Sequence, residues 1–502
     1  MTAREAYDRL VAHGRASADI GAALSLLSWD QQVMLPAAAH AGRAAQIGEL
    51  TAILHRRATD PAIGDWLAAC EESELTAVPA SPEAANIREW RRDYDLAVKI
   101  PQDLAVALAR AASTGQRAWE LARKGNDFQA FAPQLKELLE LSKQKAEALG
   151  YAGEPYDALL DGFEPGETTD TITPILVELR DAIRAIMDAV AGAPAPAPLP
   201  GGPYPIADQE AFLAEVTRRI GLPPEASRLD VSAHPFSTQI GPGDVRITVR
   251  YDTDDCTKAL FGAVHETGHS LYSLGHDSGD ARHGTPMGEY VSLGVHESQS
   301  RLWENQVARS LPFWKHFLPL AGKHFPQLTG VAPEAVFKAV GAIAPGLIRV
   351  DADETTYNLH IVLRFELELA LVRGDLAVAD LPGAWNAKSE EILGIVPPDD
   401  ASGCLQDVHW ATGAFGYFPT YSLGNLYAAC LFEAAGKAIP DLPQRMAAGD
   451  FGALLAWLRT NIHEKGRLLR PRDLITAATG QAPTAGPLIR HLRAKAAAIY
   501  GV

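Results

Sequence analysis

Apolar and polar residues follow a helical spacing along most of the chain. Segment 128–149 is typical of an amphipathic helix, because its apolar residues recur one helical turn apart with lysines between them: Phe131, Leu135, Leu138, Leu139, Leu141 and Leu149. Proline interrupts the pattern at Asp60-Pro61, Ser81-Pro82 and Ile100-Pro101, where helices are expected to begin or end. Residues 1–190 are therefore predicted to form a series of helices.

Residues 191–206, AGAPAPAPLPGGPYPI, break this pattern with a run of proline and glycine. Such a run favours an extended, exposed connection. We take it as a soft boundary between an N-terminal helical lobe, residues 1–190, and a second lobe, residues 207–502, within one continuous unit.

A change from helical to alternating spacing occurs at Val245-Arg246-Ile247-Thr248-Val249-Arg250-Tyr251, which is rich in β-branched residues. This pattern predicts a strand. A small sheet directly before the helix described next can offer an edge to an extended peptide. The alternative is a small hairpin with a purely structural role.

The stretch Val264-His265-Glu266-Thr267-Gly268-His269-Ser270 reads H-E-x-x-H, the zinc-peptidase signature. On a helix, residues four apart share one face, so His265 and His269 can bind one metal ion. Glu266 lies beside them and can take a proton from a metal-activated water. Asp254-Asp255 fits the N-terminus of this helix. The motif makes residues 207–502 the metal-binding catalytic lobe.

A third ligand is expected from segment 285–310, which has partial helical periodicity. Glu297 lies near the middle of this segment, where a metal ion would account for a carboxylate. Glu289 and Glu304 are the alternative third ligands. The metzincin pattern does not fit, because His276 falls one place late and is expected just past the helix end. A ferritin-like di-metal site needs two Glu-x-x-His pairs, and the chain has one. The sequence thus predicts a mononuclear site.

Composition narrows the classes of partner and compartment. The 502 residues have a net charge of −17, which disfavours nucleic acid and anionic membranes as partners. The cysteines, Cys70, Cys256, Cys404 and Cys430, are widely spaced and form no C-x-x-C pair, which indicates a reducing compartment and no thiolate metal site. Glu5 and Asp8 lie where a signal peptide would need its apolar core, so none is expected, and no apolar run is long enough to span a membrane. A cytoplasmic protein is expected.

At this point the chain resembles the carboxypeptidase Taq family of metallocarboxypeptidases over essentially its whole length. The resemblance rests on six segments in a fixed order: His234-Pro235-Phe236, Asp244-Val245-Arg246-Ile247-Thr248, His265-Glu266-Thr267-Gly268-His269, His296-Glu297-Ser298-Gln299-Ser300-Arg301, Ile348-Arg349-Val350-Asp351-Ala352-Asp353 and Gly403-Cys404-Leu405-Gln406-Asp407-Val408-His409-Trp410. Each segment is modest alone, and the ordered set is specific.

The resemblance implies a mainly α-helical, two-lobed fold with a deep cleft, similar to neurolysin, and a small β-sheet beside the active site. It implies His265, His269 and Glu297 as metal ligands and Glu266 as general base. One divalent metal ion per chain follows, with zinc expected and cobalt as the alternative. The family is typically homodimeric and removes C-terminal residues from peptides with broad specificity.

Further site residues follow from the same resemblance. His409, with Tyr417 or Tyr421, fits the position of donors that stabilise the oxyanion in related peptidases, and one of the two tyrosines could instead only pack. His234 is expected in substrate binding through its conspicuous His-Pro-Phe segment.

The free α-carboxylate of a substrate needs a cation, and a bidentate arginine suits it. The family places this role on Arg349, with Arg246 as the alternative. In a purely structural interpretation, Arg349 pairs internally with Asp351 or Asp353.

Three functions remain open on these residues. The first is a metallocarboxypeptidase, and the second is an oligopeptidase of the neurolysin sort that cuts internal bonds. The third is a binding protein that kept the cleft and lost catalysis, which the intact Glu266 disfavours. The carboxylate-binding arginine distinguishes the first from the second.

Overall fold

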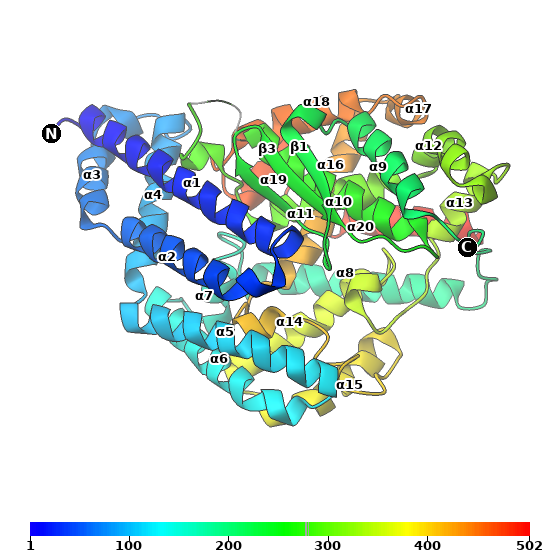
Figure 1. Cartoon of the computed structure of the whole chain (residues 1–502), viewed down its shortest axis with the longest axis horizontal. Coiled ribbons are helices and arrows are strands. Elements are labelled where there is room, and N and C mark those ends of the chain that lie inside the picture. Colours follow the sequence, from blue (N-terminus) through cyan, green and yellow to red (C-terminus); the bar gives the residue numbers. More distant parts are fainter. Residues whose placement is uncertain (277–278, 280) are drawn as a thin grey trace.

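The structure is a computed structural model that describes residues 1–276, 279 and 281–502. Helices dominate it, which confirms the mainly α class (Figure 1). The α-helices of the described chain are α1 (Ala3–Val33), α2 (His40–Ala58), α3 (Pro61–Glu71), α4 (Pro82–Lys99), α5 (Gln102–Gly125), α6 (Phe128–Leu149), α7 (Pro155–Leu160), α8 (Thr169–Val190), α9 (Ile206–Ile220), α10 (Cys256–His276), α11 (Leu293–Arg301), α12 (Leu311–His324), α13 (Pro333–Val340), α14 (Tyr357–Arg373), α15 (Leu381–Leu393), α16 (Pro419–Ala438), α17 (Leu442–Ala447), α18 (Gly452–Asn461), α19 (Pro471–Thr479) and α20 (Gly486–Tyr500).

Helix boundaries in the first lobe follow the predicted signals. α6 begins and ends with the amphipathic segment 128–149, and its apolar face is buried. Pro61 and Pro82 are the first residues of α3 and α4. The side chain of the residue before each proline caps the helix. At these positions proline costs nothing, because the first helical N–H has no partner within the helix.

A sheet of β1 (Ser227–Val231), β2 (Ser237–Gly241) and β3 (Asp244–Val249) precedes α10. β3 is the predicted strand, and it lies in the centre, parallel to β1 and antiparallel to β2. Val245 and Ile247 of β3 are fully buried. The sheet contacts the metal-motif helix directly, since the Ser237 and Ser270 hydroxyls lie 2.9 Å apart. This confirms a small sheet beside the motif.

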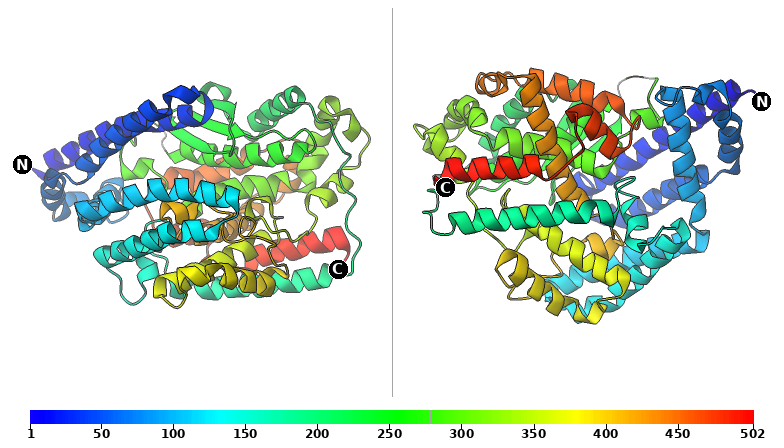
Figure 2. Two further views of the ribbon diagram at one scale, coloured as in Figure 1. Left: turned by 60° about the horizontal axis from the view of Figure 1, so that its bottom comes forward. Right: turned by 180° about the vertical axis from the view of Figure 1, so that it is seen from behind.

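Helices α1 to α4 lie at the end of the molecule that holds the N-terminus, and the C-terminus lies at the other end (Figure 1). α8 and α20 run side by side along the far face (Figure 2). One large hydrophobic cluster includes buried residues from Ala111 to Ala496, so it joins both sides of the segment 191–206. That segment has no regular structure up to α9. The division of the chain at this segment therefore stays a prediction.

A cavity of about 680 Å³ opens between the two parts of the chain. Its walls come from α1, α4 and the loop before α8 on one side, and from β2 and residues 288–293 on the other. The predicted two-lobed architecture with a cleft is thus present. Within the described residues, no helix is both long and apolar enough to cross a membrane.

Candidate active site

The metal-motif helix α10 begins directly after Asp254-Asp255, as the sequence predicted. Asp255 accepts hydrogen bonds from the backbone N–H and the hydroxyl of Thr257, at 2.9 and 2.6 Å. This caps the first turn and places a negative charge at the positive end of the helix dipole. Most of α10 is buried between the sheet and α11, which fixes the direction of the motif's side chains.

Two glycines let three helices meet at the motif. A Cβ at Gly268 would lie 2.5 Å from the backbone oxygen of Gln299 on α11. A Cβ at Gly424 of α16 would lie 2.5 Å from Cγ of Glu297. Real Cβ atoms do not approach so closely, so only glycine permits these crossings. The crossings bring the Glu297 carboxylate against the two histidines of α10.

The predicted metal ligands form one cluster. The candidate ligand atoms of His265, His269 and Glu297 all lie within 4.8 Å of one another. Oε2 of Glu297 is 3.7 Å from Nε2 of His265 and 3.4 Å from Nε2 of His269. Two imidazole nitrogens and one carboxylate oxygen, with a position left open, are the donors of a catalytic zinc-type site. The residues present therefore fit one divalent metal ion.

Outer partners orient each of these ligands. Nδ1 of His265 donates to Oε2 of Glu304 at 2.9 Å, and Nδ1 of His269 donates to the backbone oxygen of His296 at 3.1 Å. Each histidine therefore presents the lone pair of Nε2 to the cluster, as in other metal sites. Nε of Arg301 donates to Oε1 of Glu297 at 2.7 Å, which leaves Oε2 facing the histidines.

Charges around Glu297 and Glu304 keep both groups ionised. Burial opposes ionisation, but Arg301 and the two histidines hold the pKa of Glu297 well below its usual range. For Glu304, burial is again outweighed, here by Arg301, His265 and Arg309, which lower its pKa. Glu304, which the sequence left open as a third ligand, is thus an ionised hydrogen-bond partner of His265. It contacts the side of the imidazole ring that faces away from the metal cluster.

Glu266 is the carboxyl group placed to handle a proton. Its side chain is buried next to the two histidines, and burial raises its pKa above the usual value. A raised pKa suits a group that accepts a proton from water and later releases it. The geometry is therefore that of a general base beside a metal cluster.

The helix that supplies Glu297 is anchored by a carboxyl group from the first part of the chain. Glu164, in the loop after α7, accepts from the backbone N–H of Gly294 at 2.8 Å and from the Ser292 hydroxyl at 3.0 Å. Tyr427 of α16 donates to the same group at 3.1 Å. Because Glu164 is fully buried, it ties both parts of the chain to the first turn of α11.

The loop between α15 and α16 brings together the predicted oxyanion residues. Nε2 of His409 lies 3.1 Å from the Tyr421 hydroxyl, and the rings of Tyr417 and Tyr421 are 5.3 Å apart. Burial lowers the pKa of His409 to about 4 and raises that of Tyr417 to about 12. Burial also raises the pKa of Tyr421. At neutral pH the site thus has a neutral imidazole and two phenolic O–H groups.

Arg349 forms an internal ion pair, but with neither predicted partner. Its Nε and Nη2 donate to Oδ1 of Asp407 at 2.9 and 2.7 Å, and its Nη1 donates to the Tyr357 hydroxyl at 2.9 Å. The other oxygen of Asp407 accepts from Arg364 at 2.6 Å. The structural alternative, in which Arg349 pairs with Asp351 or Asp353, is wrong, because Arg349 pairs with Asp407 and Asp353 caps the turn before α14. Two guanidinium groups thus share the Asp407 carboxylate.

Arg349 also faces the oxyanion residues. Its guanidinium lies 4.9 Å from the ring centroid of Tyr421, and it is among the charges that lower the pKa of His409. The predicted arginine and the predicted histidine therefore belong to one cluster with Tyr421.

The other predicted substrate residues lie on or near the sheet. Arg246 pairs with Asp244 at 2.5 and 2.8 Å and covers the ring of Trp29 at 5.0 Å. The side chain of His234 is exposed in the loop before β2. A Cβ at Gly262, one turn before His265, would lie 3.9 Å from Cγ of the neighbouring Pro235. The roles of Arg246 and His234 stay predictions.

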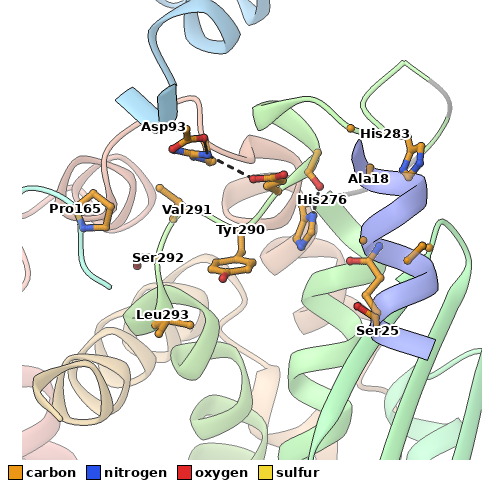
Figure 3. A pocket seen from close by; sticks show the side chains of 18 of the residues that line it. Ala18, Ser25, Asp93, Pro165, His276, His283, Tyr290, Val291, Ser292 and Leu293 are labelled. Carbon is orange, nitrogen blue, oxygen red and sulfur yellow. Dashed lines mark hydrogen bonds and ion pairs between the residues drawn. The ribbon is translucent and has the colours of Figure 1, made fainter. Parts of the chain in front are cut away.

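Aromatic rings in contact link the cavity to the metal cluster. Tyr290, which lines it, lies 5.2 Å from the ring of His296, and His296 stacks on His269 at 4.4 Å. Figure 3 shows Ala18 and Ser25 of α1 across the cavity from the segment that contains Tyr290.

His276 also lines this cavity, and it is part of α10 rather than past its end. The prediction that it follows the helix is wrong. Its Nδ1 donates to the backbone oxygen of Gly288 at 2.7 Å, and its ring packs against Tyr272. These buried contacts hold the last turn of the helix together.

Sequence reasoning missed several residues that complete the site. These are the outer partners and buried charges Arg301, Arg309, Tyr357, Arg364 and Glu368. Arg364 was the detectable one, because it follows the apolar run 361–363 and precedes Phe365, and a charged residue among such neighbours requires a buried partner. Its partner, Asp407, could not be found from local pattern.

Comparisons with known proteins agree on the identity of the whole chain. The carboxypeptidase Taq (M32) metallopeptidase family matches residues 9–496. Thermostable carboxypeptidase 1 of Thermus thermophilus is 47% identical over 513 residues, covering 100% of both proteins. Thermostable carboxypeptidase 1 of Pyrococcus furiosus is 36% identical over 98% of both. The crystal structure of an M32 carboxypeptidase from Deinococcus radiodurans superposes with a TM-score of 0.95, at 41% identity, over 99% of this chain and 100% of that one. The chain therefore belongs to the carboxypeptidase Taq (M32) family of metallopeptidases, enzymes that hydrolyse peptides.

Proposed function

We propose that this metallocarboxypeptidase hydrolyses the C-terminal peptide bond of peptides with broad specificity, with Glu266 as the general base. The observation that carries the proposal is a chain of contacts between the candidate ligands and the Arg349 cluster. Arg301 donates to Glu297 and lies 4.3 Å from the ring centroid of Tyr357, whose hydroxyl accepts from Arg349. A metal ion held by His265, His269 and Glu297 would supply Lewis acidity to a water and to the scissile carbonyl.

Glu266 performs the proton transfers in this proposal. Its carboxylate accepts the proton of the attacking water and then gives that proton to the leaving amine. Its burial supports this role, because a raised pKa brings proton affinity closer to that of the reacting groups. Burial also keeps competing water away from the carboxylate.

His409 and the two tyrosines supply donors for the developing oxyanion. Neutral imidazole and phenol groups can donate hydrogen bonds without bringing a full charge into the site. The charge of Glu297 contributes to the raised pKa of both Tyr417 and Tyr421, which supports a place for both tyrosines near the metal ligands. Which tyrosine donates to the oxyanion stays a prediction.

Arg349 binds the free α-carboxylate of the substrate in this proposal. In the described part of the chain, its bonds to Asp407 and Tyr357 use three of the five N–H groups of a guanidinium. One N–H on each terminal nitrogen is left, and this is the pair that binds a carboxylate in bidentate fashion. Asp407 and Tyr357 fix the guanidinium plane beforehand, which lowers the entropy cost of binding.

The sheet offers a place for the peptide main chain. In the described strand order β1-β3-β2, β2 is an edge strand, and its residues 239–241 line the cavity. An extended peptide can add to such an edge through backbone hydrogen bonds. Backbone recognition reads no side chains, which supports broad specificity.

Zinc is the proposed metal, with cobalt as the alternative, because two imidazoles and one carboxylate suit both ions and geometry alone does not separate them. Peptides are the proposed substrates. A homodimer, a cytoplasmic location and the absence of nucleic-acid and membrane partners stay predictions from the sequence.

Mass analysis of products from a mixed peptide set tests the proposed activity. We expect stepwise loss of single residues from the C-terminus, which stops or slows where proline adjoins the scissile bond. Internal cuts would replace the proposal with an oligopeptidase. No cleavage by protein that carries one metal ion per chain would replace it with a binding protein.

A further inference from the structure

A single buried carboxyl group binds the loop that bears the oxyanion residues at two points. Glu368 of α14 has no exposed surface. Its Oε1 accepts from the indole Nε1 of Trp410 at 2.8 Å, and its Oε2 accepts from the backbone N–H of Gly416 at 3.3 Å. The Tyr156 hydroxyl of α7 donates to Oε2 at 2.6 Å.

The two loop donors are the chain neighbours of the proposed oxyanion residues. Trp410 directly follows His409, and Gly416 directly precedes Tyr417. Between them the chain turns back, so the rings of His409 and Tyr417 come within 5.1 Å of each other. The two oxygens of one carboxylate therefore fix both ends of the turn.

We propose that Glu368 is a positioning residue for the reaction, which sets the placement of His409 relative to Tyr417 through Trp410 and Gly416. This inference rests on the proposed function, in which His409 and a tyrosine donate to the oxyanion. Glu368 touches neither the substrate nor the metal ligands in this role. It acts through the loop.

The chemistry of the donors makes a carboxylate necessary at this position. An indole N–H and a backbone N–H can only donate, so each needs an acceptor oxygen. A glutamine amide has one oxygen, and its NH₂ group would point at one of the two donors. In a buried site, the glutamine NH₂ group and the N–H donor that it faces must move apart, because neither can accept a hydrogen bond. Either Trp410 or Gly416 would then move, together with the neighbouring oxyanion residue.

The matched pair Glu368→Gln and Tyr156→Phe tests the proposal. Glu368→Gln keeps volume and shape, and we expect kcat to fall about 10- to 100-fold, because small displacements of positioned groups cost rates of this order. KM should stay within about threefold, and metal content should equal that of the wild type. Tyr156→Phe removes the third donor without touching the loop, so its kcat should stay within about twofold of the wild type.

A purely structural role for Glu368 gives a different pattern. If Glu368 only stabilised the fold, Glu368→Gln would lower the fraction of active enzyme, measured by titration with a tight-binding phosphinic peptide. The kcat per active site would stay within about twofold of the wild type. That result overturns the proposal. Should Glu368→Gln not fold, Trp410→Phe carries the test, because it removes the same bond from the loop side and keeps an aromatic ring. Its kcat per active site should fall, and an unchanged value would again overturn the proposal.

His409→Ala separates this inference from the proposed function on which it rests. If His409→Ala leaves kcat unchanged, the oxyanion role of His409 fails. If His409→Ala lowers kcat and Glu368→Gln does not, the positioning role alone fails. We expect both single variants to lower kcat, and the double variant to lose less than the product of the two losses, because both act on one unit. Fully multiplicative losses would overturn the proposal.

Discussion

Replacement of Glu304 by alanine should weaken metal binding, because we expect Glu304 to orient His265 rather than to bind the metal. Its Oε2 accepts from Nδ1 of His265 at 2.9 Å, while Nε2 of the same ring faces the metal cluster. Loss of such an orienting partner typically costs about 10- to 100-fold in metal affinity, or about 1.4–2.7 kcal/mol. Glu297→Ala removes a direct ligand and should cost more.

Glu304→Gln should separate orientation from charge. The glutamine oxygen can still accept from His265, so most of the orientation should remain. The negative charge that faces Arg301 and Arg309 at 3.2 and 3.1 Å is lost. We therefore expect near-normal metal affinity with lower thermal stability, since two buried cations lose a partner.

Competition with a chromophoric chelator measures these affinities in reloaded protein. Glu289→Ala is the matched control, because Glu289 is a neighbouring carboxylate with a 58% exposed side chain that lies 3.4 Å from Arg467. The predicted order of loss is Glu297→Ala, then Glu304→Ala, then Glu289→Ala with no loss. Equal affinity of Glu304→Ala and wild type would refute the orienting role, and equal losses for Glu304 and Glu297 would make Glu304 a ligand.

Three further changes have defined outcomes. Glu266→Gln should keep its metal and lose about 10²–10⁴-fold in kcat, and metal analysis beside kinetics checks both halves. Gly268→Ala should lower metal affinity and cost about 1–3 kcal/mol of stability, because its Cβ would lie 2.5 Å from the backbone oxygen of Gln299. The control Gly262→Ala should be neutral or stabilising in thermal melts, because its Cβ would lie 3.9 Å from Pro235. His463 is fully buried, and burial lowers its pKa to about 3. Above about pH 6.5 the side chain is neutral in both the folded and the unfolded state, so it does not change the free energy of unfolding with pH. As the pH falls towards 3, the unfolded state binds the proton and the folded state does not, so the free energy of unfolding decreases. At pH 5 this amounts to about 2 kcal/mol, and denaturant unfolding at pH 7 and 5 should show a smaller difference for His463→Gln than for wild type.

Local signals predicted the elements well where the cause is local. The apolar stripe of segment 128–149 gave the exact limits of α6, and prolines gave the starts of α3 and α4. Asp255 predicted the start of α10. The two histidines of the predicted ligand set followed from a helical motif, and the family resemblance selected Glu297 over Glu289 and Glu304.

Contacts between distant segments could not be read in this way. The partner of Arg349 is Asp407, 58 positions later, rather than a neighbour in its own motif. Glu304 stayed open as a third ligand for a different reason: the segment Leu302–Ala308 is a π-helix, in which side chains leave the α-helical stripe. The roles of Gly268 and Gly424 depend on which helices cross, and that is a property of the whole fold.

The ratio of kcat/KM on a free-acid peptide to that on its C-terminal amide tests the account most directly. The amide has no charge for Arg349, and a hydrogen bond between charged groups contributes about 1.5–3 kcal/mol, so we predict a ratio of about 10 to 100 in the wild type. In Arg349→Ala the ratio should fall close to 1, because both changes remove the same contact. Arg246→Ala should keep the wild-type ratio. A wild-type ratio near 1 would contradict the carboxypeptidase reaction, and an undiminished ratio in Arg349→Ala would move the carboxylate site away from Arg349.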